Sequence, residues 1–135
     1  MGDSLEIRLN FSTVVGKIGV LARQTADGTE GIRVLYDGEL TLTTESRNPN
    51  DHGAGHFSDA GEALAPGTVG KYTLRVYIDK SVVEAHLNAR RSITTRFYPL
   101  DLNATTGAFG VKLYNDANVT ATVDSIEVWG MRSIY

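Results

Sequence analysis

The chain has 135 residues, 41% of them hydrophobic, and 13 basic against 16 acidic side chains leave a net charge of −3. This length and balance fit one globular domain, and the scattered charge gives no reason to expect nucleic acid or a membrane surface as a partner. The absence of cysteine excludes a disulfide framework, thiol catalysis and thiolate metal sites, and no apolar run approaches the roughly 20 residues of a membrane-spanning helix.

The first half of the chain carries the period-two alternation of apolar and polar residues that is typical of half-buried strands. The strands expected there are residues 5–11, 19–22, 32–36 and 40–43. Asp37-Gly38 is a strong hairpin turn signal between the last two. Residues 46–70 contain two prolines and many glycines and show little periodicity, so they predict a long loop or a frayed strand.

The second half continues with short strands and turns, and no stretch shows helical periodicity beyond one turn. The strands expected there are residues 71–79, 82–88, 91–98, 107–114 and 119–129. Many short strands with regular turns predict an all-β fold, a two-sheet antiparallel β-sandwich of the jelly-roll, concanavalin-like kind. We expect residues 1–135 to be a single such module excised from a larger enzyme, because the polar start Met1-Gly-Asp-Ser4 falls straight into a strand.

The hairpin formed by residues 74–88 and the following strand gathers polar side chains on one face of a sheet. Alternation places the following side chains together: Arg75, Tyr77, Asp79, Glu84, His86 and Arg96. Carboxylates and guanidinium groups give directional hydrogen bonds to sugar hydroxyls, and a tyrosine ring packs on C–H faces. The face therefore suits sugar recognition. Two other interpretations stay open, a solvated face with cross-strand charge pairs and a contact surface for a catalytic domain.

The same residues resemble a known family. Leu74-Arg-Val-Tyr-Ile-Asp-Lys-Ser-Val-Val-Glu-Ala-His-Leu-Asn88, with Ser92-Ile-Thr-Thr-Arg-Phe-Tyr-Pro99, is similar to the signature hairpin in the C-terminal β-sandwich of glycoside hydrolase family 32, the invertases, inulinases and levanases. The segments Gly31–Arg47 and Ser125–Tyr135 resemble two further blocks of that module. The chain departs from the pattern at His86, where the family usually has phenylalanine.

The resemblance implies a non-catalytic module. We expect no cofactor and no metal. It implies fructose units of a levan- or inulin-type fructan as ligand, the catalytic domain of a hydrolase or fructosyltransferase as partner, and a secreted or extracellular parent. The alternative it implies is a structural domain that packs on a catalytic propeller or mediates dimerisation. Asp79 and Glu84 could lie at the separation of about 5 Å that retaining hydrolysis needs, yet the family's catalytic blocks are missing, so we expect no catalytic residues.

Three weaker signals complete the sequence. His52-Gly-Ala-Gly-His56 with Asp51 and Asp59 could hold a metal, but two histidines in a glycine-rich loop more often belong to a plain loop. The single tryptophan, Trp129, is expected to pack rather than to serve as a sugar platform. Three glycosylation sequons, at Asn10, Asn103 and Asn118, are a mild indication of a secreted parent.

Overall fold

The computed structural model describes residues 4–13, 16–25, 29–47, 49, 55–59, 70–88, 90–98, 111–116 and 121–130. Within these ranges the chain forms strands and no helix, so no helix there could cross a membrane. The strands are β1 (Ser4–Thr13), β2 (Ile18–Ala22), β3 (Gly31–Tyr36), β4 (Leu40–Glu45), β5 (Gly55–Asp59), β6 (Gly70–Asp79), β7 (Val82–Leu87), β8 (Arg91–Arg96), β9 (Lys112–Asn115) and β10 (Ala121–Gly130).

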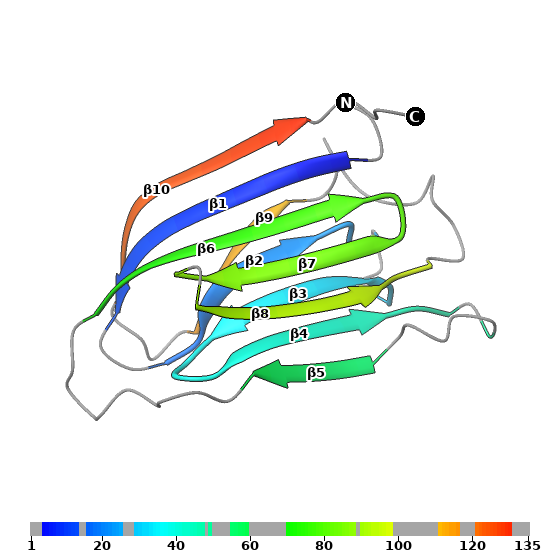
Figure 1. Ribbon diagram of the computed structural model, residues 1–135, viewed down its shortest axis with the longest axis horizontal. Coiled ribbons are helices and arrows are strands. Elements are labelled where there is room, and N and C mark those ends of the chain that lie inside the picture. The colour runs from blue at the N-terminus through cyan, green and yellow to red at the C-terminus, as the bar shows by residue number, and fades with distance from the viewer. Residues whose placement is uncertain are drawn as a thin grey trace.

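The strands form two five-stranded antiparallel sheets, which confirms the predicted sandwich. Sheet A has the order β10-β1-β6-β7-β8 and sheet B the order β5-β4-β3-β2-β9. Figure 1 looks onto sheet A, with sheet B lying behind it. β1 pairs with both β10 and β6, so the two ends of the described chain meet in the same sheet.

The core lies between the sheets, and strand alternation fills it. In β1 the side chains of Leu5, Ile7, Leu9 and Phe11 are fully buried, while the residues between them face outward. β6 and β7 contribute inward residues in the same alternation, and β2, β3 and β4 complete the core from the other sheet. Because the period is two, every outward residue of β1, β6 and β7 lies on one surface, which we call the outer face of sheet A.

An aromatic cluster closes one end of the core. Phe11 and Tyr72 are cross-strand partners with ring centroids 5.5 Å apart, and the Tyr36 ring lies 4.7 Å from that of Tyr72. Tyr36 is buried, and this burial, with the neighbouring Tyr72 hydroxyl, raises its pKa to about 12. A buried phenol is held neutral because its charged form would lose its hydration.

The turn between β6 and β7 consists of two residues, Lys80 and Ser81, since Asp79 pairs with Val82. Lys80 has a φ of 53°, in the left-handed region that two-residue hairpins require. Nη1 of Arg23, from beyond β2, donates a hydrogen bond of 3.2 Å to the Lys80 carbonyl. The turn that presents the predicted site is therefore held by a side chain from outside the hairpin.

One expectation is confirmed in one of its alternatives, and another needs correction. The alternative of a strand within residues 46–70 is confirmed: β5 pairs with β4 at the edge of sheet B, and its side chains alternate between half-buried and exposed. Trp129 is not packed in the core. It lies on the outer face of sheet A opposite Glu6, is 38% exposed, and has the Arg8 guanidinium 5.1 Å from its ring centroid.

Strand β10 differs from the other strands of sheet A because its inward side chains are not covered. Val123, Ile126 and Val128 pair with buried residues of β1, so they point to the core side, yet each is between 37% and 41% exposed. In Figure 1 no labelled strand of sheet B lies behind β10. Leu113, on the edge strand β9, is similarly exposed. We call these four residues the apolar edge.

Candidate functional site

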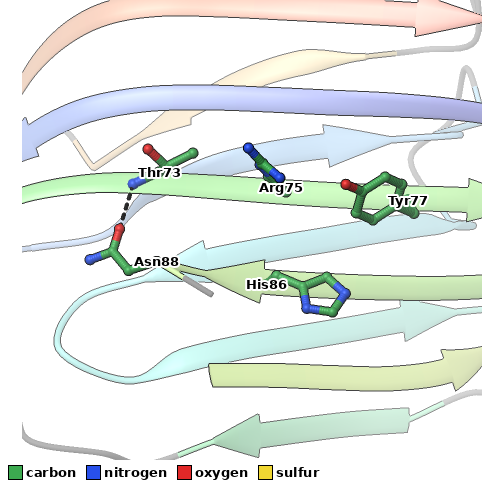
Figure 2. A pocket seen from close by; sticks show the side chains of 5 residues that line it. All are labelled: Thr73, Arg75, Tyr77, His86 and Asn88. Carbon is green, nitrogen blue, oxygen red and sulfur yellow. Dashed lines mark hydrogen bonds between the residues drawn. The ribbon is translucent and has the colours of Figure 1, made fainter. Parts of the chain in front are cut away.

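The outer face of sheet A contains an open hollow of about 470 Å³ over β6, β7 and the turn that follows β7. Figure 2 shows the five side chains that line it: Thr73, Arg75, Tyr77, His86 and Asn88. The first three follow one another along β6 at alternating positions, and His86 is the cross-strand partner of Arg75. The hollow therefore lies where two polar rows of adjacent strands meet.

One end of the hollow is fixed by a reciprocal pair of hydrogen bonds. The main-chain N–H of Thr73 donates to the side-chain Oδ1 of Asn88 at 2.8 Å. The main-chain N–H of Asn88 in turn donates to the Thr73 carbonyl at 3.0 Å. Asn88 has a φ of 53°, a conformation that asparagine tolerates better than most residues. The pair extends the β6–β7 ladder by one step, and in Figure 2 the Asn88 side-chain oxygen is the atom that bonds to Thr73.

The other end of the hollow is aromatic. The rings of Tyr77 and His86 meet edge to face with centroids 5.8 Å apart. Nε2 of His86 lies 3.4 Å from Oε2 of Glu84, which precedes it by two residues on the same face of β7. Glu84 itself pairs with Tyr77 across the strands. The Glu84 carboxylate thus orients the His86 imidazole, and the His86 and Tyr77 rings line this end of the hollow.

Arg75 stands in the middle of the hollow (Figure 2). The side chain is exposed, and its guanidinium group makes no hydrogen bond or ion pair with any other residue that the structure describes. Arginine has five N–H donors and no acceptor. The hollow therefore offers a set of unused, directional donors beside a tyrosine hydroxyl and an asparagine amide.

The structure brings together three of the six residues predicted from sequence, Arg75, Tyr77 and His86. Glu84 lies beside the site, next to His86 and across the strands from Tyr77, but it does not line the hollow. Asp79 accepts a hydrogen bond of 2.5 Å from Ser4 at the end of the strand pair, and Arg96 donates to Ser81 and to the Tyr98 hydroxyl. Neither Asp79 nor Arg96 lines the hollow.

Thr73 and Asn88 were missed by the sequence analysis. The alternation that selected Arg75 and Tyr77 also places Thr73 on the same face, one step earlier. Asn88 continues the row of Glu84 and His86 in the same way. A search for charged groups passes over both, although an amide and a hydroxyl are as useful to a sugar as a charge is.

The other sequence signals lie elsewhere. Nδ1 of His56 is 3.0 Å from the Thr43 hydroxyl on sheet B, and His52 and Asp51 fall outside the described residues. The described ranges contain no cluster of three metal-ligating side chains. Among the sequons only Asn10 is described, and its amide donates a 2.8 Å hydrogen bond to Ser125.

A comparison with protein families identifies the family of this chain. A family model described as "Glycosyl hydrolases family 32 C terminal" matches residues 1–130. The acid beta-fructofuranosidase 2, vacuolar, of a Rosa hybrid cultivar is 36% identical over 64 residues, which are 47% of this chain and 10% of that protein. The chain thus spans a small part of that relative.

Two solved structures share the fold. The exo-inulinase of Aspergillus awamori superposes with a TM-score of 0.75 at 19% identity, over 99% of this chain and 26% of that chain. The carbohydrate binding module CBM66 from Bacillus subtilis superposes with a TM-score of 0.56 at 15% identity, over 94% of this chain and 75% of that chain. Since the family model covers all but the last five residues, the chain is a member of the family of C-terminal modules of glycosyl hydrolase family 32.

Proposed function

We propose that this module is a non-catalytic carbohydrate-binding domain that recognises fructose units of a levan- or inulin-type fructan through the hollow on sheet A. The observation that carries the proposal is the Arg75 guanidinium, which lines the hollow with Tyr77, His86 and Asn88 and has no partner among the residues that the structure describes. A sugar ring presents hydroxyls on its edge and C–H groups on its faces. The hollow is complementary to both, because it has N–H donors for the hydroxyls at its centre and aromatic rings for the C–H faces at one end.

We choose fructose because the chain is similar to an exo-inulinase and to a beta-fructofuranosidase, both named for fructose-containing substrates. A module of an enzyme that acts on a polymer gains from binding the same polymer, because tethering raises the local concentration of substrate. The fold shared with a carbohydrate binding module fits this function. The secreted or extracellular location expected for the parent is part of the same proposal.

The hollow also supports the absence of catalysis. Glycoside hydrolysis uses two carboxyl groups that flank the scissile bond. None of the five residues that line the hollow carries a carboxyl group, and Asp79 and Glu84 are occupied by Ser4 and His86. We therefore propose that any hydrolase or transferase activity of the parent protein resides outside residues 1–130.

The test is calorimetric titration of the isolated module with levan and inulin, alongside an activity assay on both polymers and on sucrose. We expect weak, enthalpic binding with dissociation constants in the micromolar to millimolar range, about −4 to −8 kcal/mol, and no release of fructose. Absence of heat with every fructan would remove sugar binding, and turnover by the pure module would remove the non-catalytic assignment.

A second function is favoured by a different observation, the apolar edge. Leu113, Ile126 and Val128 present uncovered apolar surface between the edges of the two sheets. We propose that this edge packs on the catalytic domain of the parent enzyme. The superposition covers only about a quarter of the exo-inulinase chain, so most of that enzyme lies outside the part that this module resembles. Because the edge and the hollow lie on opposite faces of sheet A, both functions can operate in one molecule.

A further inference from the structure

A second hollow, of about 410 Å³, lies beside the first, toward β1 and β10. Its polar lining comes from Asn10, Lys71, Thr73, Asp124 and Ser125. Thr73 lines both hollows. Since β7, β6, β1 and β10 are consecutive in sheet A, the two hollows follow each other across four adjacent strands.

The floor of the second hollow is a chain of side-chain hydrogen bonds. The Thr73 hydroxyl donates to Oδ1 of Asn10 at 2.7 Å, and Nδ2 of Asn10 donates to the Ser125 hydroxyl at 2.8 Å. Because each of these hydrogen bonds has a defined donor and acceptor, the groups that remain for a ligand are also defined. The Ser125 hydroxyl keeps its own proton to donate, Asn10 keeps a second N–H, and the Thr73 oxygen keeps a lone pair.

A β-bulge shapes the far side of this hollow. In the β1–β10 pair Asn10 is opposite Ser125, but the next residue, Phe11, is opposite Val123. Asp124 is therefore the extra residue of the bulge. Bulges turn a strand locally and re-aim side chains, and they are frequent beside functional sites. Asp124 is exposed and lines the same hollow as Lys71, so an acceptor and a donor flank the hydrogen-bonded floor.

We propose that the two hollows form one groove that binds two or more neighbouring sugar units along a fructan chain. This inference rests on the proposed function of the first hollow. Three inter-strand steps separate β7 from β10, about 14 Å at the usual strand spacing, which exceeds the width of a single furanose ring. The second floor offers donors at Ser125 and Asn10 and an acceptor at Thr73, and sugar hydroxyls both donate and accept. The groove recognises an internal stretch of the polymer and not only its terminal unit.

The experiment is a titration of the module with fructose and with linear inulin-type oligosaccharides of increasing length, followed by calorimetry and by amide chemical shifts. We expect affinity to rise about tenfold from the monosaccharide to the trisaccharide and then to level off, a change of about 1.4 kcal/mol. The amides of Asn10 and Ser125 should shift with the longer ligands and stay unchanged with fructose.

Two variants localise the effect. Ser125→Ala and Asp124→Ala should each reduce the gain with length and leave fructose binding as in the wild type. Ser92→Ala, on the same face of β8 but outside both hollows, is the matched control and should change nothing. Thermal midpoints identify a variant that fails to fold, and the wild-type shifts at Asn10 and Ser125 remain decisive in that case.

The outcomes separate this inference from the function on which it rests. Fructose binding that Arg75→Ala abolishes, with no gain for longer chains, would overturn the second subsite and leave the first in place. A length gain that survives both Ser125→Ala and Asp124→Ala would also overturn it. If neither fructose nor any oligosaccharide binds, both the groove and the proposed function fall.

Discussion

Ser4 donates a 2.5 Å hydrogen bond to the carboxylate of Asp79, its direct partner across the β1–β6 pair. Ser4 is buried, so the carboxylate satisfies a hydroxyl that has lost water. The bond ties the start of β1 to the end of β6, next to the turn that leads into β7. Asp79, which the sequence selected as a sugar ligand, has in the structure a role in the fold.

Asp79→Ala is therefore expected to reduce stability and to leave sugar affinity unchanged. A buried hydroxyl without its partner costs about 1–3 kcal/mol, which lowers the thermal midpoint by several degrees in a domain of this size. Urea denaturation and thermal melts measure the loss. Ser4→Ala should cost less, because it removes the hydroxyl as well, and the double variant should show coupling between the two sites. A tenfold loss of fructan affinity without a change in stability would contradict this assignment.

Arg75→Ala is expected to weaken fructan binding about tenfold or more. Each hydrogen bond from a charged group contributes about 1.5–3 kcal/mol, and Arg75 has no partner among the described residues to lose. The melting temperature should therefore stay the same. The matched control is Arg33→Ala, an arginine of β3 on sheet B that pairs with Glu45 at 3.2 Å. Equal affinities of the two variants would move the sugar site off the outer face of sheet A.

Glu84→Gln should have a smaller effect than Arg75→Ala, because Glu84 acts through His86. The carboxylate lies 3.4 Å from Nε2 of His86 and is outside the lining of the hollow. Loss of the charge weakens the orientation of the imidazole without removing a ligand contact. Calorimetry of Glu84→Gln, His86→Ala and the double variant gives the coupling: we expect the double variant to bind no worse than His86→Ala alone. Additive losses would indicate a separate contact between Glu84 and the sugar.

The apolar edge makes its own prediction. The double variant Ile126→Thr, Val128→Thr should reduce self-association of the isolated module, since exposed apolar patches promote association. Both positions are exposed, and threonine keeps the β-branched shape that strands favour, so little stability should be lost. Val82→Thr, on the outer face of β7, is the control. Sedimentation measures the result, and a wild-type module that stays monomeric at high concentration would argue against the edge as a docking surface.

The sequence predicts features that depend on neighbouring residues better than features that depend on residues far apart in the chain. Alternation along β1, β6 and β7 correctly predicted which residues face the core, because the period of a strand is local. It could not show that Asp79 is opposite Ser4, 75 positions away, since strand order is set by the whole fold. For the same reason the second hollow, which joins residues of β1, β6 and β10, was invisible.

Glu30 illustrates the same limit. It precedes β3 in a polar stretch, and nothing in the sequence marks it as buried, yet its side chain is fully enclosed. Its Oε1 accepts a 2.9 Å hydrogen bond from the Arg47 amide, and the Arg47 guanidinium lies 3.5 Å from Oε2. Ser46, adjacent to Arg47, donates a 2.8 Å hydrogen bond to the Tyr98 carbonyl. The Ser-Arg pair at the end of the family-like hairpin thus joins two blocks distant in sequence, which only the fold reveals.

Tyr36 leads to a prediction about alkaline pH. Burial raises the pKa of Tyr36 to about 12 in the folded protein, against about 10 in the unfolded chain. A raised folded pKa means that the unfolded state releases its proton first, so the contribution is complete below pH 10 and is lost as pH rises through 12. A difference of about two pKa units corresponds to about 2–3 kcal/mol. Urea denaturation at a series of pH values from 8.5 to 12 should show stability falling over this window. Tyr36→Phe, which has no phenol to ionise, should fall less steeply; parallel curves for the two proteins would show that Tyr36 does not govern the alkaline transition.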